Sequence, residues 1–116
     1  MQYRLDTQTH DIAPNEAAAL GREVILVDVR TTGECDAGHR PGATHVAIEA
    51  IQAGWRGRDA RLPFVTLCRT GEIAQHAAQL LRDKGRDAVA LHGGMLAWAA
   101  AGLPLVTNTG APPRVH

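Results

Sequence analysis

A cysteine at the seam between an apolar segment and a helical pattern has the clearest chemical potential in this chain. Cys68 closes the apolar run VTLC, and Gly71 follows three residues later, where a helical pattern begins. The first N–H groups of a helix lack partners inside the helix and carry roughly half a positive charge between them. They favour a thiolate, and Gly71 lets the backbone approach a bound group without a Cβ in the way. Residues 68–72 are therefore a candidate cradle for an anion beside a nucleophilic sulfur.

The same position also has an interpretation without chemistry. A free cysteine is often simply a small, buried, apolar residue. Thr70 favours a reactive Cys68, because its hydroxyl could donate a hydrogen bond to a bound anion. From the residues alone, both interpretations stay open.

Two charged residues and two histidines invite a catalytic or metal-binding interpretation. Asp28 and Arg30 flank Val29 at the end of an apolar run, and charges there are rarely left unpaired, so a structural role is favoured over catalysis. His39 and His45 lie six residues apart without a third ligand, which makes a poor metal site. We predict that His39 braces its loop and that the chain holds no metal.

The other candidates are weaker. His76 would lie two turns along the helix, about 12 Å from Cys68, and is predicted to be a surface residue. Cys35 could convert a Cys68 persulfide or sulfenate into a disulfide, but nothing in the sequence places the two together. Met95 and Trp98 are expected to pack against the sheet, and Trp55 could be core or lid.

Composition excludes several classes of function. The chain has 116 residues, 45% of them apolar, with 12 basic and 12 acidic side chains, which predicts one globular domain without a nucleic-acid or membrane partner. Two cysteines do not make a disulfide framework, and no apolar run approaches a membrane span of ~20 residues. With no leader visible, we expect a cytoplasmic protein with reduced thiols and no cofactor. The domain is expected at residues 1–105, with a flexible tail at 106–116.

The elements that must position Cys68 alternate along the chain. Apolar runs predict strands at 23–29, 45–48, 63–67 and 87–91. Helices are predicted at 14–20, 31–39, 72–84 and 93–102, with a turn at 40–43 and an ambiguous segment at 49–61. Within the third of these helices, Ile73 to Leu81 form the predicted apolar stripe. This order predicts an α/β fold with a mostly parallel sheet, and Cys68 falls at the carboxyl end of a strand, where such sheets bind ligands.

Four stretches follow one another in a characteristic order and spacing: ILVDVRTTGE at 25–34, AGHRPGATHVAI at 37–48, VTLCRTGEIA at 65–74 and LHGGMLAWAAAGLPL at 91–105. Together they resemble the rhodanese family of sulfurtransferases. The resemblance implies a parallel five-stranded sheet flanked by helices on both faces. It implies that Cys68 is a nucleophile cycling between thiolate and persulfide, with a small donor such as thiosulfate and a thiol or cyanide acceptor. The implied donor-binding residues are Arg69, Thr70, Gly71, Glu72 and Ile73, with Asp28, Arg30 and His39 supporting the site.

The loop departs from the family pattern at one point. Many single-domain members carry an Arg five residues after the cysteine, followed by Ser, where this chain has Ile73 and Ala74. The lost cation, with Glu72 adjacent, predicts weaker binding of a doubly charged donor, although Arg69 could compensate. Phosphatases and arsenate reductases of this fold place Arg six residues after the cysteine, and Ala74 disfavours that activity.

Two other functions remain beside the enzyme. The chain could be a persulfide carrier or docking module, which accepts sulfur from a partner protein and turns over thiosulfate poorly. It could also be a silent recognition domain, although the nucleophile disfavours this.

Overall fold

The computed structural model describes residues 11–30, 44–55 and 62–104. The predicted helix at 31–39, the turn at 40–43 and the tail at 106–116 lie outside the described residues, as do Cys35 and His39.

A parallel sheet of five strands forms the centre of the molecule, as predicted. The strands are β1 (Asp11–Ile12), β2 (Ile25–Asp28), β3 (Thr44–His45), β4 (Phe64–Leu67) and β5 (Ala88–Leu91). Their order across the sheet is β1-β5-β4-β2-β3, and every neighbouring pair is parallel. Strand β4 therefore lies in the middle, and every residue of β4 and β5 is buried because both faces of the sheet are covered.

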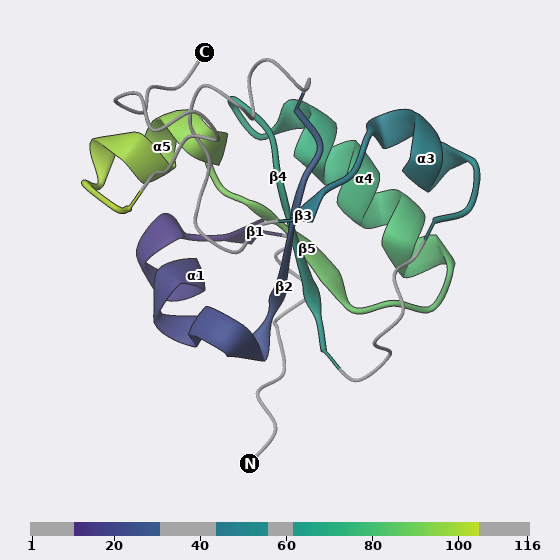
Figure 1. The fold of residues 1–116 in the computed structure, drawn as a ribbon, viewed down its shortest axis with the longest axis horizontal. Helices are drawn as coiled ribbons and strands as arrows, with labels where there is room; N and C mark the ends of the chain where they lie inside the picture. Colours follow the sequence, from purple (N-terminus) through teal and green to yellow (C-terminus); the bar gives the residue numbers. More distant parts are fainter. Residues whose placement is uncertain (1–10, 31–43, 56–61, 105–116) are drawn as a thin grey trace.

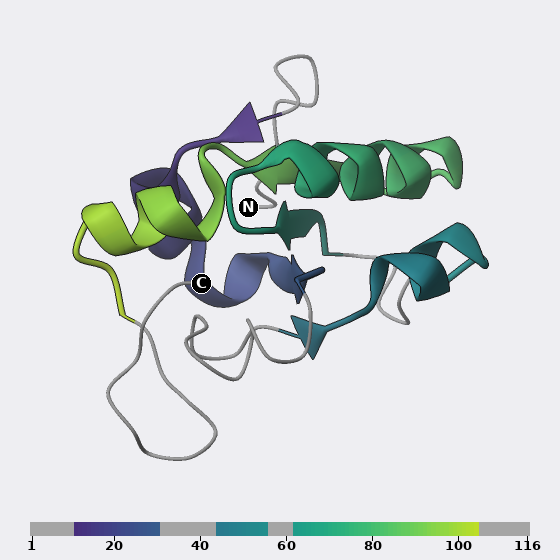
Figure 2. The ribbon, with the colours of Figure 1, turned by 90° about the horizontal axis from the view of Figure 1, so that it is seen from above.

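Helices cover the two faces of the sheet in pairs. They are α1 (Pro14–Leu20), α3 (Ile48–Gln52), α4 (Glu72–Asp83) and α5 (Gly94–Ala100), with a short 3₁₀ helix, η1 (Gly21–Glu23). Figure 1 shows α1 and α5 on one side of the strands and α3 and α4 on the other, and Figure 2 shows the same two layers from above. Two apolar clusters follow this division, one containing Leu20 and Trp98 and the other containing Ile51 and Leu81.

Helix α4 lies between the predicted bounds, but its buried face is displaced by one residue. The buried side chains are Ala74, Ala77, Ala78 and Leu81. The prediction that Ile73 begins the buried stripe is wrong, because Ile73 is 51% exposed. Ala74 takes that place in the first turn, and this turns Ile73 away from the sheet.

Two predicted strands are shorter than their apolar runs. The first begins at Ile25 rather than at residue 23, because Glu23 belongs to η1. The second is confined to Thr44–His45 at the edge of the sheet, and Ile48, predicted as strand, begins α3 instead. Pairing with β2 covers only these two residues, followed by one bond from the Val46 N–H to the Asp28 carbonyl.

Strand β1 has too few residues for a pattern, and both main-chain pairing with β5 and side-chain contacts hold it in place. The Asp11 carboxylate accepts a hydrogen bond from the Gln75 side chain and contacts His92 Nδ1 at 3.1 Å. These contacts tie the edge strand to α4 and to the segment after β5. Within the described part of the chain, no helix has the length and apolar character needed to cross a bilayer.

Candidate functional site

Cys68 lies where β4 passes into α4. Strand β4 ends at Leu67, so Cys68 emerges at the carboxyl edge in the middle of the sheet. The residue is only 3% exposed, and its Sγ accepts hydrogen bonds from the N–H groups of Gly71 at 3.0 Å and Ala74 at 3.3 Å. Such donors stabilise negative charge on sulfur. The thiol is therefore buried in a polar main-chain setting rather than in apolar packing alone.

The conformation of Gly71 makes this geometry accessible. Gly71 is the N-cap of α4 and has φ 110°, in the region that favours glycine over residues with a Cβ. The sharp bend turns the chain back over Cys68, so that N–H groups from the loop and from the first turn of α4 reach one sulfur atom. A glycine three residues after the cysteine is the sequence signal that identified this arrangement.

A cavity of about 410 Å³ opens above the sulfur. It combines residues of the Cys68 loop with the ends of β2 and β3 and the start of α3. The lining residues are Val29, Arg30, His45, Ala47, Ile48, Glu49, Cys68, Arg69, Thr70, Glu72 and Ile73. Four of the five predicted donor-binding residues thus line the cavity, and the fifth, Gly71, contributes its N–H to the sulfur.

Sequence reasoning missed one wall of this cavity. His45, Ile48 and Glu49 come from β3 and α3, and only His45 had been considered, as a poor metal ligand. These residues could have been identified from the sequence, because they lie at or just after the carboxyl end of a strand parallel to β4. Ligands bind at the carboxyl ends of the strands in such sheets, and the same argument identified Cys68.

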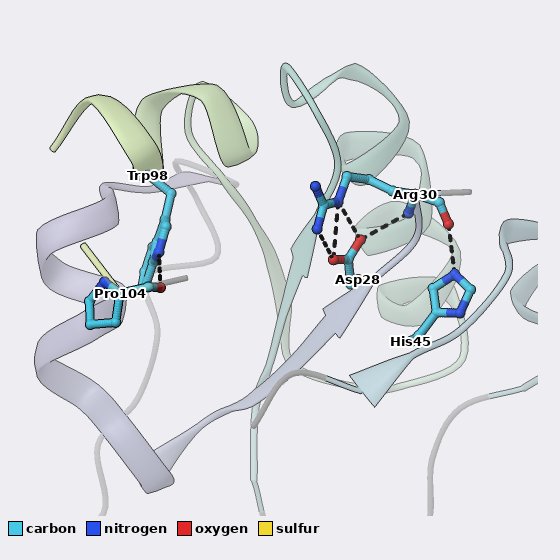
Figure 3. Close-up of polar contacts among 5 residues, drawn as sticks. All are labelled: Asp28, Arg30, His45, Trp98 and Pro104. Carbon is cyan, nitrogen blue, oxygen red and sulfur yellow. Dashed lines mark hydrogen bonds and ion pairs between the residues drawn. The ribbon is translucent and has the colours of Figure 1, made fainter. Parts of the chain in front are cut away.

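Asp28 and Arg30 form a buried ion pair beside the cavity (Figure 3). Arg30 Nη2 donates to Asp28 Oδ2 at 2.7 Å, and Arg30 Nε donates to both carboxylate oxygens at 3.0 and 3.1 Å. The Arg30 main-chain N–H also donates to Asp28 Oδ1 at 3.0 Å, while His45 Nε2 lies 2.7 Å from the Arg30 carbonyl oxygen. The pair braces the end of β2 and links it to β3, so the charge that Arg30 brings to the cavity wall is balanced by Asp28.

The hydroxyl of a buried threonine in β4 anchors the first turn of α4 to the sheet. Thr66 lies in β4 and is fully buried, and its hydroxyl donates to the Ala74 carbonyl oxygen at 2.7 Å. Since the Ala74 N–H faces the sulfur of Cys68, Thr66 ties the sheet to the residue that carries one of the two sulfur-binding N–H groups.

The tryptophans belong to the core and its edge. Met95 and Trp98 are buried against the sheet, as predicted, and the Trp98 indole N–H donates to the Pro104 carbonyl at 2.8 Å (Figure 3). Trp55 is half-buried and packs on Phe64, with ring centroids 5.7 Å apart, which answers the question of core or lid in favour of the core edge.

Of the remaining candidates, His76 lies in the described part of the chain, and Cys35 and His39 do not. His76 is exposed on α4, as predicted, and does not belong to the lining. The roles suggested for Cys35 and His39 stay predictions, since both residues lie outside the described part. Residues 11–30, 44–55 and 62–104 contain no group of three side chains able to hold a metal ion.

Comparison with known proteins places the chain in a family. The model of the rhodanese-like domain matches residues 13–101, most of the chain. The chain belongs to the rhodanese-like domain family. That membership supports a sulfurtransferase-type or sulfur-related function in general terms, and domains of this family commonly interact with sulfur donors and partner proteins.

Similar proteins include a transcriptional regulator and two proteins of known structure. This rhodanese-like domain is 39% identical over 92 residues to the HTH-type transcriptional regulator Rv0324 of Mycobacterium tuberculosis, and the match covers 78% of the chain but only 40% of the regulator. A rhodanese-related protein from Thermoplasma volcanium has the same fold, with a TM-score of 0.78, 21% identity and coverage of 90% and 98% of the two chains. Thiosulfate sulfurtransferase from Pseudomonas aeruginosa matches with a TM-score of 0.73 and 28% identity, over 92% of this chain and 20% of that one.

Proposed function

We propose that this rhodanese-like domain is a sulfurtransferase with Cys68 as its nucleophile. The single observation that carries the proposal is the convergence of the Gly71 and Ala74 N–H groups on Cys68 Sγ beneath a cavity of about 410 Å³. Donors preorganised at the place where charge develops are a large source of catalytic stabilisation. The likeness to thiosulfate sulfurtransferase from Pseudomonas aeruginosa supports thiosulfate as the first donor to assay.

The proposed reaction has two balanced steps. The Cys68 thiolate attacks the outer sulfur of thiosulfate, forming a new S–S bond while the S–S bond of thiosulfate breaks and sulfite leaves with the electron pair. The product is a Cys68 persulfide that keeps one negative charge. Cyanide or a thiolate then attacks the terminal sulfur, which regenerates the Cys68 thiolate and releases thiocyanate or a persulfide of the acceptor.

Residues around the sulfur have distinct proposed roles. The N–H groups of Gly71 and Ala74 hold the thiolate, those of residues 69–73 receive the donor and the persulfide, and the Thr70 hydroxyl adds a donor at the cavity wall. Arg69, Glu72 and Glu49 are exposed and contribute charge at the mouth. Asp28 and Arg30 support the wall through their ion pair rather than through contact with the reacting sulfur.

Replacing the nucleophile tests the proposal. Cys68→Ser and Cys68→Ala are expected to abolish sulfur transfer from thiosulfate to cyanide while the circular dichroism spectrum stays that of the folded protein. Treatment of the wild type with thiosulfate is expected to add about 32 Da, one sulfur atom, to the peptide that contains Cys68. Equal turnover by Cys68→Ala and wild type, or a mass gain on Cys35 instead, would contradict the assignment.

A persulfide carrier is the second candidate, and the exposure of Ile73 favours it. Ile73 lines the cavity and is 51% exposed, at the position where many relatives carry an Arg. An apolar side chain at the mouth suits a protein surface better than a free dianion. The Mycobacterium tuberculosis relative is named a transcriptional regulator, and the match spans less than half of it, so a domain of this kind also occurs as part of a larger protein.

Donor preference separates the two candidates. An enzyme for free donors is expected to turn over thiosulfate or 3-mercaptopyruvate faster than it accepts sulfur from a protein persulfide, whereas a carrier shows the reverse order. Both functions require Cys68. Retention of a partner protein by Cys68→Ala, together with no sulfur transfer by the wild type from any donor, would instead indicate a recognition domain.

A further inference from the structure

The loop that carries Cys68 is held from behind by the first turn of α5. The Met95 N–H donates to the Cys68 carbonyl oxygen at 2.8 Å, and the Leu96 N–H donates to the Arg69 carbonyl oxygen at 3.0 Å. N–H groups in the first turn of a helix have no acceptor within the helix. Here they find acceptors in the loop, although α5 belongs to the helix layer opposite α4 (Figures 1 and 2).

Gly94 makes this approach sterically accessible. A Cβ at residue 94 would lie 2.5 Å from the carbonyl oxygens of both Cys68 and Arg69, and the residue has φ 64°. No other amino acid fits there without moving the loop or the helix. Gly85 provides the contrast, because it also has a positive φ, 82°, but a Cβ there would meet no atom within 4 Å.

The direction of the two carbonyls fixes the direction of two N–H groups. In a trans peptide the C=O and N–H vectors point in opposite directions. Because the carbonyls of Cys68 and Arg69 face α5, the N–H groups of Arg69 and Thr70 face away from it. The cavity lies on that other side, since its described lining includes Arg69 and Thr70 but no residue of α5.

We infer that Gly94 is a positioning residue, through which α5 aims the Arg69 and Thr70 N–H groups into the cavity beside Cys68. These two groups add to the Gly71 and Ala74 N–H groups that already bind Sγ. That these N–H groups also stabilise a Cys68 persulfide rests on the proposed function. Their effect on the Cys68 thiolate does not depend on that function.

Alkylation of Cys68 at two pH values measures this effect without any sulfur transfer. Iodoacetamide reacts with the thiolate, so the rate at pH 7 relative to the rate at pH 10, followed on the Cys68 peptide by mass spectrometry, reports the stabilisation of the thiolate. Gly94→Ala displaces the two carbonyls and with them the Arg69 and Thr70 N–H dipoles that face the cavity beside the sulfur, so the ratio is expected to fall several-fold. Gly85→Ala introduces similar backbone strain away from the loop and is expected to leave the ratio within twofold of wild type.

A second pair of variants acts on the donor side of the same contact. Leu96→Pro replaces the N–H that holds the Arg69 carbonyl by a ring carbon, so that the hydrogen bond is lost and the carbonyl is pushed away, while proline is tolerated in the first turn of a helix. Leu96→Ala keeps that N–H and removes only a side chain that is 38% exposed. The alkylation ratio is expected to fall several-fold in Leu96→Pro and to stay near wild type in Leu96→Ala.

The outcomes separate this inference from the proposed function. An unchanged ratio in folded Gly94→Ala and Leu96→Pro overturns the inference, and so does an equal fall in Gly85→Ala. If Gly94→Ala does not fold, the Leu96 pair decides alone. A lowered ratio in both variants of a protein that moves no sulfur from thiosulfate upholds the positioning role and refutes the proposed function.

Discussion

A cation at position 73 is expected to raise the preference of this domain for doubly charged donors. Ile73 lines the cavity above Cys68 and is 51% exposed, so Ile73→Arg adds a charge at the mouth without disturbing the buried face of α4. The resemblance to the rhodanese family leads us to expect an arginine at this position in many members. The substitution therefore tests whether the missing cation limits the use of thiosulfate.

Coulomb's law sets the scale of the effect. For a separation of about 6 Å in water, a unit charge stabilises a dianion by about 1.4 kcal/mol, which corresponds to roughly a tenfold gain in kcat/KM. Salt at ~0.15 M has a Debye length of about 8 Å and reduces this gain to roughly threefold. The interaction with a singly charged donor is half as large, so its gain is expected to be about the square root of that for thiosulfate.

The assay compares kcat/KM for thiosulfate and for the methanethiosulfonate anion, with cyanide as acceptor, at low salt and at ~0.15 M salt. Ile73→Gln gives the change in kcat/KM that results from losing the isoleucine side chain without adding a charge. That change is subtracted from the change measured for Ile73→Arg. His76→Arg places the same charge on an exposed residue of α4 outside the cavity lining and is expected to give no comparable gain. Equal gains for the two donors, or a gain that salt does not reduce, would refute the electrostatic reasoning.

Two further predictions concern the residues that support the site. Asp28→Asn is expected to destabilise the fold by about 3–5 kcal/mol, because it leaves the buried Arg30 guanidinium without its carboxylate. Arg30→Met is expected to cost less, because the Asp28 carboxylate keeps the hydrogen bond from the main-chain N–H of residue 30, which is 3.0 Å long in the wild type. Urea unfolding of both variants checks this order, and the reverse order would contradict it. Thr66→Val removes the hydroxyl that binds the Ala74 carbonyl at 2.7 Å and is expected to cost about 1 kcal/mol, whereas Thr66→Ser restores most of it. Equal unfolding midpoints for Thr66→Val and wild type would show that this bond contributes nothing.

The fold was predictable where local pattern and tertiary environment agree. Strands β4 and β5 lie within the predicted runs because they are buried on both faces, and α4 keeps the predicted length because its apolar positions recur at helical spacing. The buried face of α4 was displaced by one residue because Ile73, which is apolar like the buried residues of the helix, lines the cavity instead of packing on the sheet. Strand β1 has two residues and depends on side-chain contacts from α4 and from the segment after β5, which no local pattern records.

The site was predictable for the residues that are close together in the sequence. Cys68 and Gly71 belong to one loop, and their spacing alone indicates N–H groups around a sulfur. The wall formed by His45 and Glu49 depends on the order of the strands, which places β3 and α3 beside the loop although they come earlier in the chain. The role inferred for Gly94 depends on a main-chain contact between two segments that are distant in sequence.

Helices from both layers make hydrogen bonds to the loop after β4. N–H groups from the loop and from α4 bind the Cys68 sulfur on one side, while α5 binds the carbonyls of Cys68 and Arg69 on the other. Since α5 does not contribute to the described cavity lining, changes in its first turn should alter the reactivity of the thiolate without altering the charge of the mouth. Changes at Glu49 and Ile73 should act first on the charge of the mouth, because these residues line the cavity but do not hold the loop carbonyls. The position of the loop N–H groups is thus expected to depend on α5, and the charge that a donor meets on α3 and the exposed side of α4.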